Sequence, residues 1–475
     1  MQESQSGLKL WLSMTAVGLF TFMSTLDGSI VNIALPVMSK EMNIPMNQAT
    51  WTVSIYLIVI SGLLALFGNL GDQLGKIKIF RIGTVVFTLG SVLAGIDLGL
   101  PFLLFARFVQ AVGASMTMSN SFGITTTLAP QNLRGRAMSF IAAWVSLGSI
   151  LGPALGGMLL QNLSWSYIFW INVPIGIIAI VAGAFLLPKS SKQGVKPEID
   201  WWGAISLFLF VAILFLGFNI AQVQGFLAPV PVVTIIIAII FFVLFVRHEL
   251  HAEKPLLDLT IFKSKLFTIS LITAFLVFVT NFFINVLMPF YLENLRGLST
   301  GTSGMYMLLW PVAMLVFSAV SGTLADKMDR EYVTLFGLTV LAVVMFSWFF
   351  AGANTPMLVV GLLLAGSGFG MAFFQSPNNA LIMSNAPQDK LGVAGSLNAL
   401  ARNLGMITGT TLVTSVLYAV MSAQLGTSVT TYPAKHPEAF VAGMHVAFAV
   451  AGILLVIAFI MTYYRVWMRR REKRA

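Results

Sequence analysis

The residue best placed to do chemistry is Asp27, which lies in a long apolar run between Lys9 and Lys40. The chain has 17 Asp and Glu residues, and we assign the other 16 to loops, tails or the last turns of helices. A carboxylate in hydrocarbon costs about 2.5–3.5 kcal/mol even on a lenient insertion scale. A protonatable group on a transport path is the default explanation for such a residue, so we predict that Asp27 carries a proton.

Arg107 is the basic residue that we expect to meet Asp27. It lies six residues after Pro101, roughly 9 Å deep, whereas Asp27 lies nine residues before Pro36, roughly 13 Å deep at about 1.5 Å per residue. The comparable depths predict that Asp27 and Arg107 form a proton-coupling pair. A static ion pair that only holds two helices together is the alternative.

The composition places these residues in a bilayer. The chain is 57% apolar and only 9% charged, whereas a soluble domain carries about 25% charged residues. A spanning helix needs about 20 apolar residues, and only helices or closed barrels satisfy their backbone in lipid. We therefore predict an all-α membrane protein with fourteen spans, at 10–36, 49–71, 79–98, 101–128, 136–160, 166–187, 202–222, 229–247, 266–292, 302–325, 332–352, 357–384, 392–422 and 440–464.

The Lys and Arg residues predict the orientation of these spans. With the N-terminus inside, only Lys40, Arg296 and Lys435 fall in outer loops, and the other basic residues of the loops and tails fall inside. This imbalance follows the positive-inside rule. We attribute the net charge of +10 to orientation and to contact with anionic lipid, not to nucleic acid.

Two segments of the chain repeat. Ala129-Pro130-Gln131-Asn132 recurs as Ala386-Pro387-Gln388-Asp389, and Gly68-Asn69-Leu70-Gly71-Asp72 corresponds to Gly322-Thr323-Leu324-Ala325-Asp326. Parallel repeats are typical of large secondary transporters. The spans 202–222 and 229–247 have no partner in the repeat, so we predict a six plus two plus six arrangement. The predicted domains are a bundle at 1–190, a linker with two spans at 191–260, and a bundle with a basic tail at 261–475.

The loop after the second span has a pattern suited to a conformational switch. Glycines let helices approach closely, an aspartate can pair with a neighbouring helix end, and lysines face anionic headgroups. We predict that this loop and its second copy act as switch loops through Gly68, Asp72, Gly75, Lys76, Asp326 and Arg330. A purely structural turn with solvated charges is the alternative.

The fifth span contains a glycine-rich run that predicts close helix packing and a hinge. Three glycines share a helix face at a spacing of four, and the proline removes a backbone hydrogen bond. The hinge residues are Gly148, Gly152, Pro153, Gly156 and Gly157. The second half keeps Gly405 and Gly409 but has Thr410 where the first has Pro153. Ordinary helix packing is the alternative.

Several polar and aromatic residues interrupt the apolar spans and are candidates for a substrate cavity. We count Arg402 as the second buried cation beside Arg107, and aromatic rings can bind flat cations. The candidates are Asn32, Gln110, Trp144, Trp310, Phe374, Gln375, Asn378, Asn398 and Arg402. Hydrogen bonds between helices are the alternative for the amides. We place His445 near an outer helix end and assign it a structural role.

These motifs resemble those of the major facilitator superfamily. The loop at 68–78 resembles its signature loop, although Gln73 stands where a basic residue is common and Asp329 replaces a usual glycine in the second copy. The environment of Arg107 resembles the embedded Arg motif of proton-coupled members, and 148–157 resembles the antiporter motif of exporters. The phrase at 27–36 is similar to the first-helix signature of the fourteen-helix drug:proton antiporter branch, with Ser29 in place of the usual Thr.

The resemblance implies an exporter of hydrophobic, cationic compounds in exchange for protons, working by alternating access in a bacterial plasma membrane. We expect a monomer whose partners are a small-molecule substrate, protons and lipids. The absence of cysteine excludes disulfides, thiolate metal sites and Cys nucleophiles, and no phosphate-binding loop is present. We expect no metal, no cofactor and no enzymatic activity. Two alternatives stay open, a symporter or facilitator for a nutrient or metabolite, and a non-transporting membrane protein such as a lipid-modifying enzyme.

Overall fold

The structure, a computed structural model, is helical with no strand in the residues that it describes, which are 7–44, 46–188, 198–224, 228–427, 433 and 435–472. Fourteen of its helical segments are long and apolar enough to cross a membrane. This confirms the predicted number of spans. Most observed ends lie within a few residues of the predicted ones, and the last span is longer than expected because it runs on to Arg469.

The helices of the N-terminal part follow one another with short connections. Gly75, at a φ of 102°, separates α3 from α4 and permits the sharp turn between them. The helices are α1 (Gly7–Glu41), α2 (Met46–Ala49), α3 (Trp51–Leu74), α4 (Lys76–Ala94), α5 (Leu100–Leu128), α6 (Arg134–Asn162), α7 (Tyr167–Trp170), α8 (Asn172–Leu186), α9 (Trp201–Gln224) and α10 (Pro229–Glu249).

The C-terminal part repeats this pattern of long helices and short turns. Pro289 ends the α-helical part of the first helix, and a π-helical segment, η3 (Phe290–Leu295), follows it. The remaining elements are η2 (Leu259–Lys263), α11 (Lys265–Pro289), α12 (Thr300–Met307), α13 (Leu309–Lys327), α14 (Arg330–Trp348), α15 (Met357–Ser384), η4 (Gln388–Lys390), α16 (Leu391–Leu425) and α17 (Pro437–Glu472).

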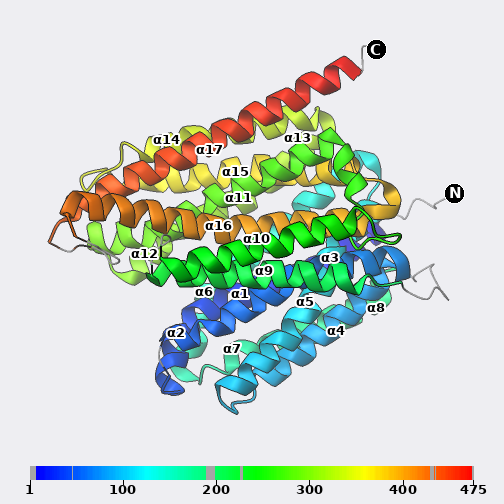
Figure 1. The fold of residues 1–475 in the computed structure, drawn as a ribbon, viewed down its shortest axis with the longest axis horizontal. Helices are drawn as coiled ribbons and strands as arrows, with labels where there is room; N and C mark the ends of the chain where they lie inside the picture. Colours follow the sequence, from blue (N-terminus) through cyan, green and yellow to red (C-terminus); the bar gives the residue numbers. More distant parts are fainter. Residues whose placement is uncertain are drawn as a thin grey trace. The chain divides into compact units, whose positions relative to one another are not determined.

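The chain forms two compact units by its contacts. The first contains residues 1–212, 239–261 and 383–400, and the second contains 213–238, 262–382 and 401–475. In the first unit α1 packs on α6 and α8, and α4 packs on α5 and α8. In the second unit α17 runs beside both α11 and α14 (Figure 1). The predicted domain boundaries at 190 and 260 stay predictions.

The two copies of the glycine run pack in the same way within their own units. A Cβ on Gly148 of α6 would lie 2.7 Å from the carbonyl oxygen of Phe22 in α1. A Cβ on Gly405 of α16 would lie 2.9 Å from the carbonyl oxygen of Phe275 in α11. The repeat found in the sequence therefore corresponds to equivalent helix contacts.

Candidate functional site

The Asp27 carboxylate is fully buried and accepts hydrogen bonds from three side chains. Arg107 Nη1 donates to Asp27 Oδ2 at 2.7 Å. Gln110 Nε2 and Asn172 Nδ2 donate to Asp27 Oδ1 at 2.9 and 2.8 Å. Asp27 and Asn172 are 0% exposed and Arg107 is 1% exposed. The predicted meeting of Asp27 with Arg107 is therefore present in the structure, and α1, α5 and α8 each contribute to it.

Arg107 is held by more than its carboxylate partner. Its Nε donates to the carbonyl oxygen of Thr52 at 3.0 Å, and its Nη1 also donates to Gln110 Oε1 at 2.6 Å. The guanidinium lies 4.1 Å from the ring centroid of Tyr56, within the range of a cation–π contact. Neutral acceptors and a ring thus surround the cation, so its orientation does not depend on Asp27 alone.

Gln110 extends the network to a fourth long helix. Its Nε2 also donates to Ser91 Oγ of α4 at 2.9 Å. Gly90 allows this approach, because a Cβ there would lie 2.5 Å from the backbone of Gln110. In the structure Gln110 binds Asp27, and its predicted place in a substrate cavity stays a prediction. The sequence analysis did not identify Asn172 or Ser91, because the sequence does not indicate which group a neutral amide or hydroxyl will bind.

An apolar cluster lies beside this network, and the ring centroid of Phe169, one of its members, is 5.6 Å from the Arg107 guanidinium. It is formed by buried side chains of α1, α5 and α7, including Ile30, Ala34, Ala106 and Phe169, each at 0% exposure. Such packing excludes water, and an unpaired charge there is costly.

The first predicted switch loop, residues 68–78, contacts the beginning of α16, and its switching role stays a prediction. Asp72 Oδ1 accepts from the backbone N–H of Gly392 at 2.8 Å, and Asp72 Oδ2 accepts from that of Val393 at 2.9 Å. Lys76 Nζ lies 2.6 Å from Asp72 Oδ1. A carboxylate at the first turn of a helix is stabilised by the free N–H groups and the helix dipole.

The second switch loop has the same internal ion pair. Arg330 Nη2 lies 3.8 Å from Asp326 Oδ1, with the four-residue spacing of Lys76 and Asp72. Asp329 occupies the N-cap of α14, and its side chain accepts from the backbone N–H of Glu331. The residue that departs from the family pattern at this position therefore caps a helix.

The hinge glycines lie along the contact between α6 and α1. A Cβ on Gly152 would lie 1.8 Å from Ser29 Oγ, and a Cβ on Gly156 would lie 2.8 Å from Ile30 Cγ1. A Cβ on Gly157 would meet nothing within 4 Å. Helix α6 continues through Pro153, whose side chain lies outside the described residues. The close packing is present, and the hinge movement stays a prediction.

The other cavity candidates occupy varied places. Trp144 packs edge to face with Phe22 and Phe140. Asn378 Nδ2 donates to the carbonyl oxygen of Ser270 at 3.0 Å, so it joins α15 to α11. The side chain of Asn32 lies outside the described residues. Phe374, Gln375 and Asn398 are buried, whereas Trp310 and Arg402 are partly exposed. Their contact with a substrate stays a prediction.

A second buried ion pair corrects two expectations. Glu331, which we assigned to a loop, lies in the first turn of α14 and is 1% exposed. Its partner Arg465 is 0% exposed, and Arg465 Nε donates to Glu331 Oε2 at 2.7 Å. Arg402, counted as the second buried cation, is only partly buried. The signal that was missed is the four-residue spacing of Arg465 and Arg469, which places both on one helix face.

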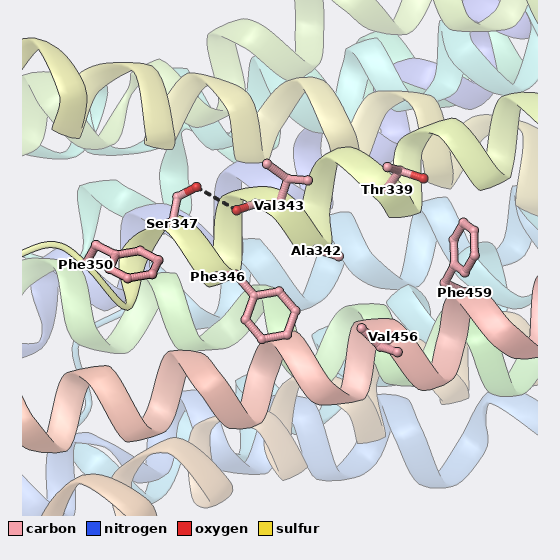
Figure 2. Close-up of a pocket in the computed structure, with 8 residues that line it drawn as sticks. All are labelled: Thr339, Ala342, Val343, Phe346, Ser347, Phe350, Val456 and Phe459. Carbon is pink, nitrogen blue, oxygen red and sulfur yellow. Dashed lines mark hydrogen bonds between the residues drawn. The ribbon is translucent and has the colours of Figure 1, made fainter.

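An apolar groove lies between α14 and α17 (Figure 2). Its lining residues are Thr339, Ala342, Val343, Phe346, Ser347, Phe350, Val456 and Phe459. The Thr339 and Ser347 hydroxyls donate to carbonyl oxygens of their own helix. None of the predicted cavity residues lines this groove, and it offers no charged group to a cationic ligand.

Comparisons with known proteins show which family the chain resembles. A family model described as Major Facilitator Superfamily matches residues 17–410. The riboflavin transporter RibZ of Clostridioides difficile is 31% identical over 467 residues, which is 98% of each chain. The multidrug export protein EmrB of Escherichia coli is 26% identical over 425 residues, covering 87% of this chain and 81% of EmrB. A solved structure of the proton:xylose symporter XylE matches 96% of this chain and 95% of XylE, with a TM-score of 0.66 and 16% identity.

Proposed function

This chain belongs to the major facilitator superfamily, and we propose that it is a proton-coupled exporter of hydrophobic, cationic compounds. Two groups of relatives, the multidrug exporters and the riboflavin transporter, support transport of a small molecule. The proposal for protons rests on one observation, the buried Asp27 carboxylate with its three donors. In this proposal Asp27 carries the proton and Arg107 is its partner.

Protonation of Asp27 would change the contacts between helices. An ionised carboxylate only accepts hydrogen bonds, whereas a protonated one has an O–H donor and less acceptor capacity. Asp27 Oδ2 accepts from Arg107 of α5 and Oδ1 from Asn172 of α8, so a proton on either oxygen weakens one connection from α1. Arg107 keeps Thr52 O and Gln110 Oε1 as acceptors when that happens. Proton binding is thereby linked to the position of α1.

Coupling to substrate follows from competition for the same carboxylate. A cationic compound favours ionised Asp27, and a proton neutralises it, so each lowers the affinity for the other. The proposed orientation has both termini in the cytoplasm, based on the distribution of Lys and Arg. The switch loops and the hinge glycines of α6 would allow the conformational change, which exposes the site to one side of the membrane at a time.

The test is Asp27→Asn in everted membrane vesicles, with Asp27→Glu as the matched variant that keeps a carboxylate. Ethidium uptake and the movement of protons that ethidium drives are measured together. We expect Asp27→Asn to abolish both, and Asp27→Glu to retain a measurable part of each. Proton-coupled ethidium uptake by Asp27→Asn at the unmodified rate would contradict the proposal.

A second candidate function is transport of riboflavin into the cell. The 31% identity to RibZ over 98% of both chains favours it. Riboflavin is neutral and planar, so its recognition would not require a cation site. Accumulation of labelled riboflavin by intact cells that express the chain, without ethidium uptake by everted vesicles, would support this function over export of cations.

A further inference from the structure

We propose that the segments flanking α9 and α10 form a clasp on the first switch loop, which holds α3 against the start of α16 and opens in each transport cycle. The linker clasp consists of the side chains of Asn69, Gln73, Asp258 and Lys390 with the backbone of Glu198 and Leu256. It assigns a role to the two helices that the sequence repeat leaves unmatched. The inference rests on the alternating-access part of the proposed function and is independent of Asp27.

Gln73 makes a two-point contact with the segment that precedes α9. Its Nε2 donates to the carbonyl oxygen of Glu198 at 3.0 Å, and its Oε1 accepts from the backbone N–H of Glu198 at 2.9 Å. A side-chain amide can pair with one backbone residue in this way because it has a donor and an acceptor side by side. A basic side chain, which is common at this position in the family pattern, has no acceptor. Gln73 therefore differs from the family pattern at a position where its amide pairs with Glu198, a residue of the segment that precedes the two extra helices.

Asn69, one helical turn before Gln73, contacts the segment that follows α10. Its Nδ2 donates to the carbonyl oxygen of Leu256 at 2.8 Å, and its Oδ1 accepts from Gln73 Nε2. Leu256 and Leu257 are 2% and 3% exposed, so this segment is packed into the protein. One face of α3 thus holds both ends of the α9 and α10 pair.

Asp258 carries the connection to the element that precedes α16. Its Oδ2 forms an ion pair with Lys390 Nζ of η4, and its Oδ1 accepts from the backbone N–H of Thr260 at 2.8 Å. Lys390 directly precedes α16, whose first N–H groups bind Asp72. The linker clasp therefore bridges α3 and the beginning of α16 beside the Asp72 contact.

Contacts within the linker hold its own two ends together. His248 Nε2 lies 2.9 Å from both Asp200 oxygens, and Glu249 Oε2 accepts from the backbone N–H of Leu257 at 2.9 Å. Asp200 also accepts from the N–H of Gly203 in the first turn of α9. The segments before α9 and after α10 consequently move as one piece, which is what a clasp requires.

The surfaces held by the linker clasp are in close contact. A Cβ on Gly68 would lie 1.8 Å from Ser396 Oγ, and a Cβ on Gly392 would lie 2.4 Å from the carbonyl oxygen of Gly68. Ser396 is 1% exposed. A passage at this place needs α3 to move away from the start of α16, and Gln73, Asn69 and Lys390 must then release their partners.

The first test uses reversible cross-linking, for which this chain is well suited because it has no cysteine. Asp258→Cys with Lys390→Cys joins the linker to η4, and a short bis-methanethiosulfonate reagent can bridge them. His436→Cys with Glu438→Cys is the control, since these residues form an exposed ion pair outside the linker clasp. Ethidium uptake by everted vesicles is measured before cross-linking, after it, and after reduction with dithiothreitol.

We expect cross-linking to stop uptake by the Asp258→Cys/Lys390→Cys protein, reduction to restore it, and the control pair to keep its uptake throughout. Full uptake with the bridge between positions 258 and 390 in place would overturn the proposal. If the unmodified protein does not move ethidium, the proposed export of cations fails, and the second test still decides on the clasp.

The second test needs no transport. Ser396→Cys is labelled with N-ethylmaleimide in purified full-length protein in nanodiscs, with and without Gln73→Leu. We expect labelling to become about tenfold faster with Gln73→Leu, as expected when an amide pairing of two neutral hydrogen bonds is lost. Gln161→Leu, at an exposed position of α6, is the control. An unchanged labelling rate at Ser396→Cys overturns the proposal. Ala447→Cys, at a fully buried position of α17, is labelled in parallel. If Gln73→Leu raises its labelling rate equally, the whole protein has loosened, and the proposal is likewise overturned.

Discussion

Arg465 Nε lies 2.7 Å from Glu331 Oε2, and the two side chains are 0% and 2% exposed. Arg465 Nη1 also donates to Ser270 Oγ and to Asn378 Oδ1. Arg469, which is 37% exposed, lies 3.7 Å from Glu331 Oε1. Through these contacts Arg465 of α17 joins α11, α14 and α15. All four helices belong to the second unit, and the contacts lie at the beginning of α14.

The Asp27 network joins the corresponding members of the first copy. Its residues come from α1, α4, α5 and α8, and they are Asp27, Ser91, Arg107, Gln110 and Asn172. The two networks differ in depth, because Asp27 lies twenty residues into α1 and Glu331 one residue into α14. Glu331 is near a helix end with a second arginine beside it, and this arrangement favours a stabilising role over proton transport.

We predict that breaking the Glu331 and Arg465 pair on one side destabilises the protein strongly. Glu331→Gln leaves a buried guanidinium without its counter-ion, at a cost of about 3–5 kcal/mol. Thermal unfolding in nanodiscs is the measurement, and Glu198→Gln, whose ion pair is exposed, is the control, with an expected change of about 0.5 kcal/mol or less.

The double variant Glu331→Gln/Arg465→Met decides whether the charge itself is responsible. Because it removes both charges, we expect it to be more stable than Glu331→Gln alone. A double variant as unstable as the sum of the two single ones would show that packing, not charge pairing, dominates at this place.

The prediction for the hinge glycines follows from the contact between α6 and α1. Gly152→Ala introduces a methyl group 2.7 Å from Ser29 Cβ, which side-chain rotation cannot move, so α1 or α6 must shift, and overpacking of this kind costs about 1–3 kcal/mol. Gly157→Ala meets nothing within 4 Å and is the matched control. We expect a lower melting temperature and a lower ethidium uptake rate for Gly152→Ala only. Equal effects of both variants would mean that uptake depends on the flexibility that glycine gives to α6, and not on the contact between α6 and α1.

Much of this fold could be predicted because hydropathy determines which segments span a membrane. The fourteen spans and the meeting of Asp27 with Arg107 followed from run lengths and from depths counted along helices. Counting depth along the helices did not identify Glu331 and Arg465 as buried. Both were expected near helix ends, where a charged side chain is normally in contact with water. Helix α17 in fact continues to Glu472, well past the predicted end at 464, and buries Arg465 against α14.

The partners of Asp27 could be predicted only in part. A charge in an apolar run requires an opposite charge, which limited the search to few residues. Neutral partners such as Asn172 and Ser91 have no such requirement, because amides and hydroxyls can bond to backbone carbonyls anywhere along a helix. The linker clasp was hidden for the same reason, since Gln73 and Asn69 bind backbone groups of distant segments.

Arg107→Lys tests whether the shape of the guanidinium matters for function. Arg107 uses Nε for Thr52 O and Nη1 for Asp27 and Gln110, and one ammonium group cannot reproduce this fork. We expect ethidium uptake to fall by about tenfold to a hundredfold, since a hydrogen bond involving a charged group contributes about 1.5–3 kcal/mol. Arg296→Lys is the control. Arg296 uses a single nitrogen, Nη1, for both of its described hydrogen bonds, and one ammonium group can replace it. Normal uptake by Arg107→Lys would mean that only the positive charge is required.

The ion pair of the linker clasp predicts how stability depends on pH. Hydrogen bonds from Lys390 and Thr260 lower the pKa of Asp258 from 3.8 to about 2. Because the pKa is lower in the folded protein, Asp258 stabilises the fold fully above about pH 4, and this stabilisation is lost as the pH falls from about 4 towards 2.

The measurement is the difference in melting temperature between the unmodified protein and Asp258→Asn. We expect a constant difference between about pH 5 and pH 8 that shrinks below about pH 4. Lys390→Met should show the same small pH dependence as Asp258→Asn, because either change removes the pair. A difference that grows as the pH falls would mean that Asp258 is not paired with Lys390 in the folded protein.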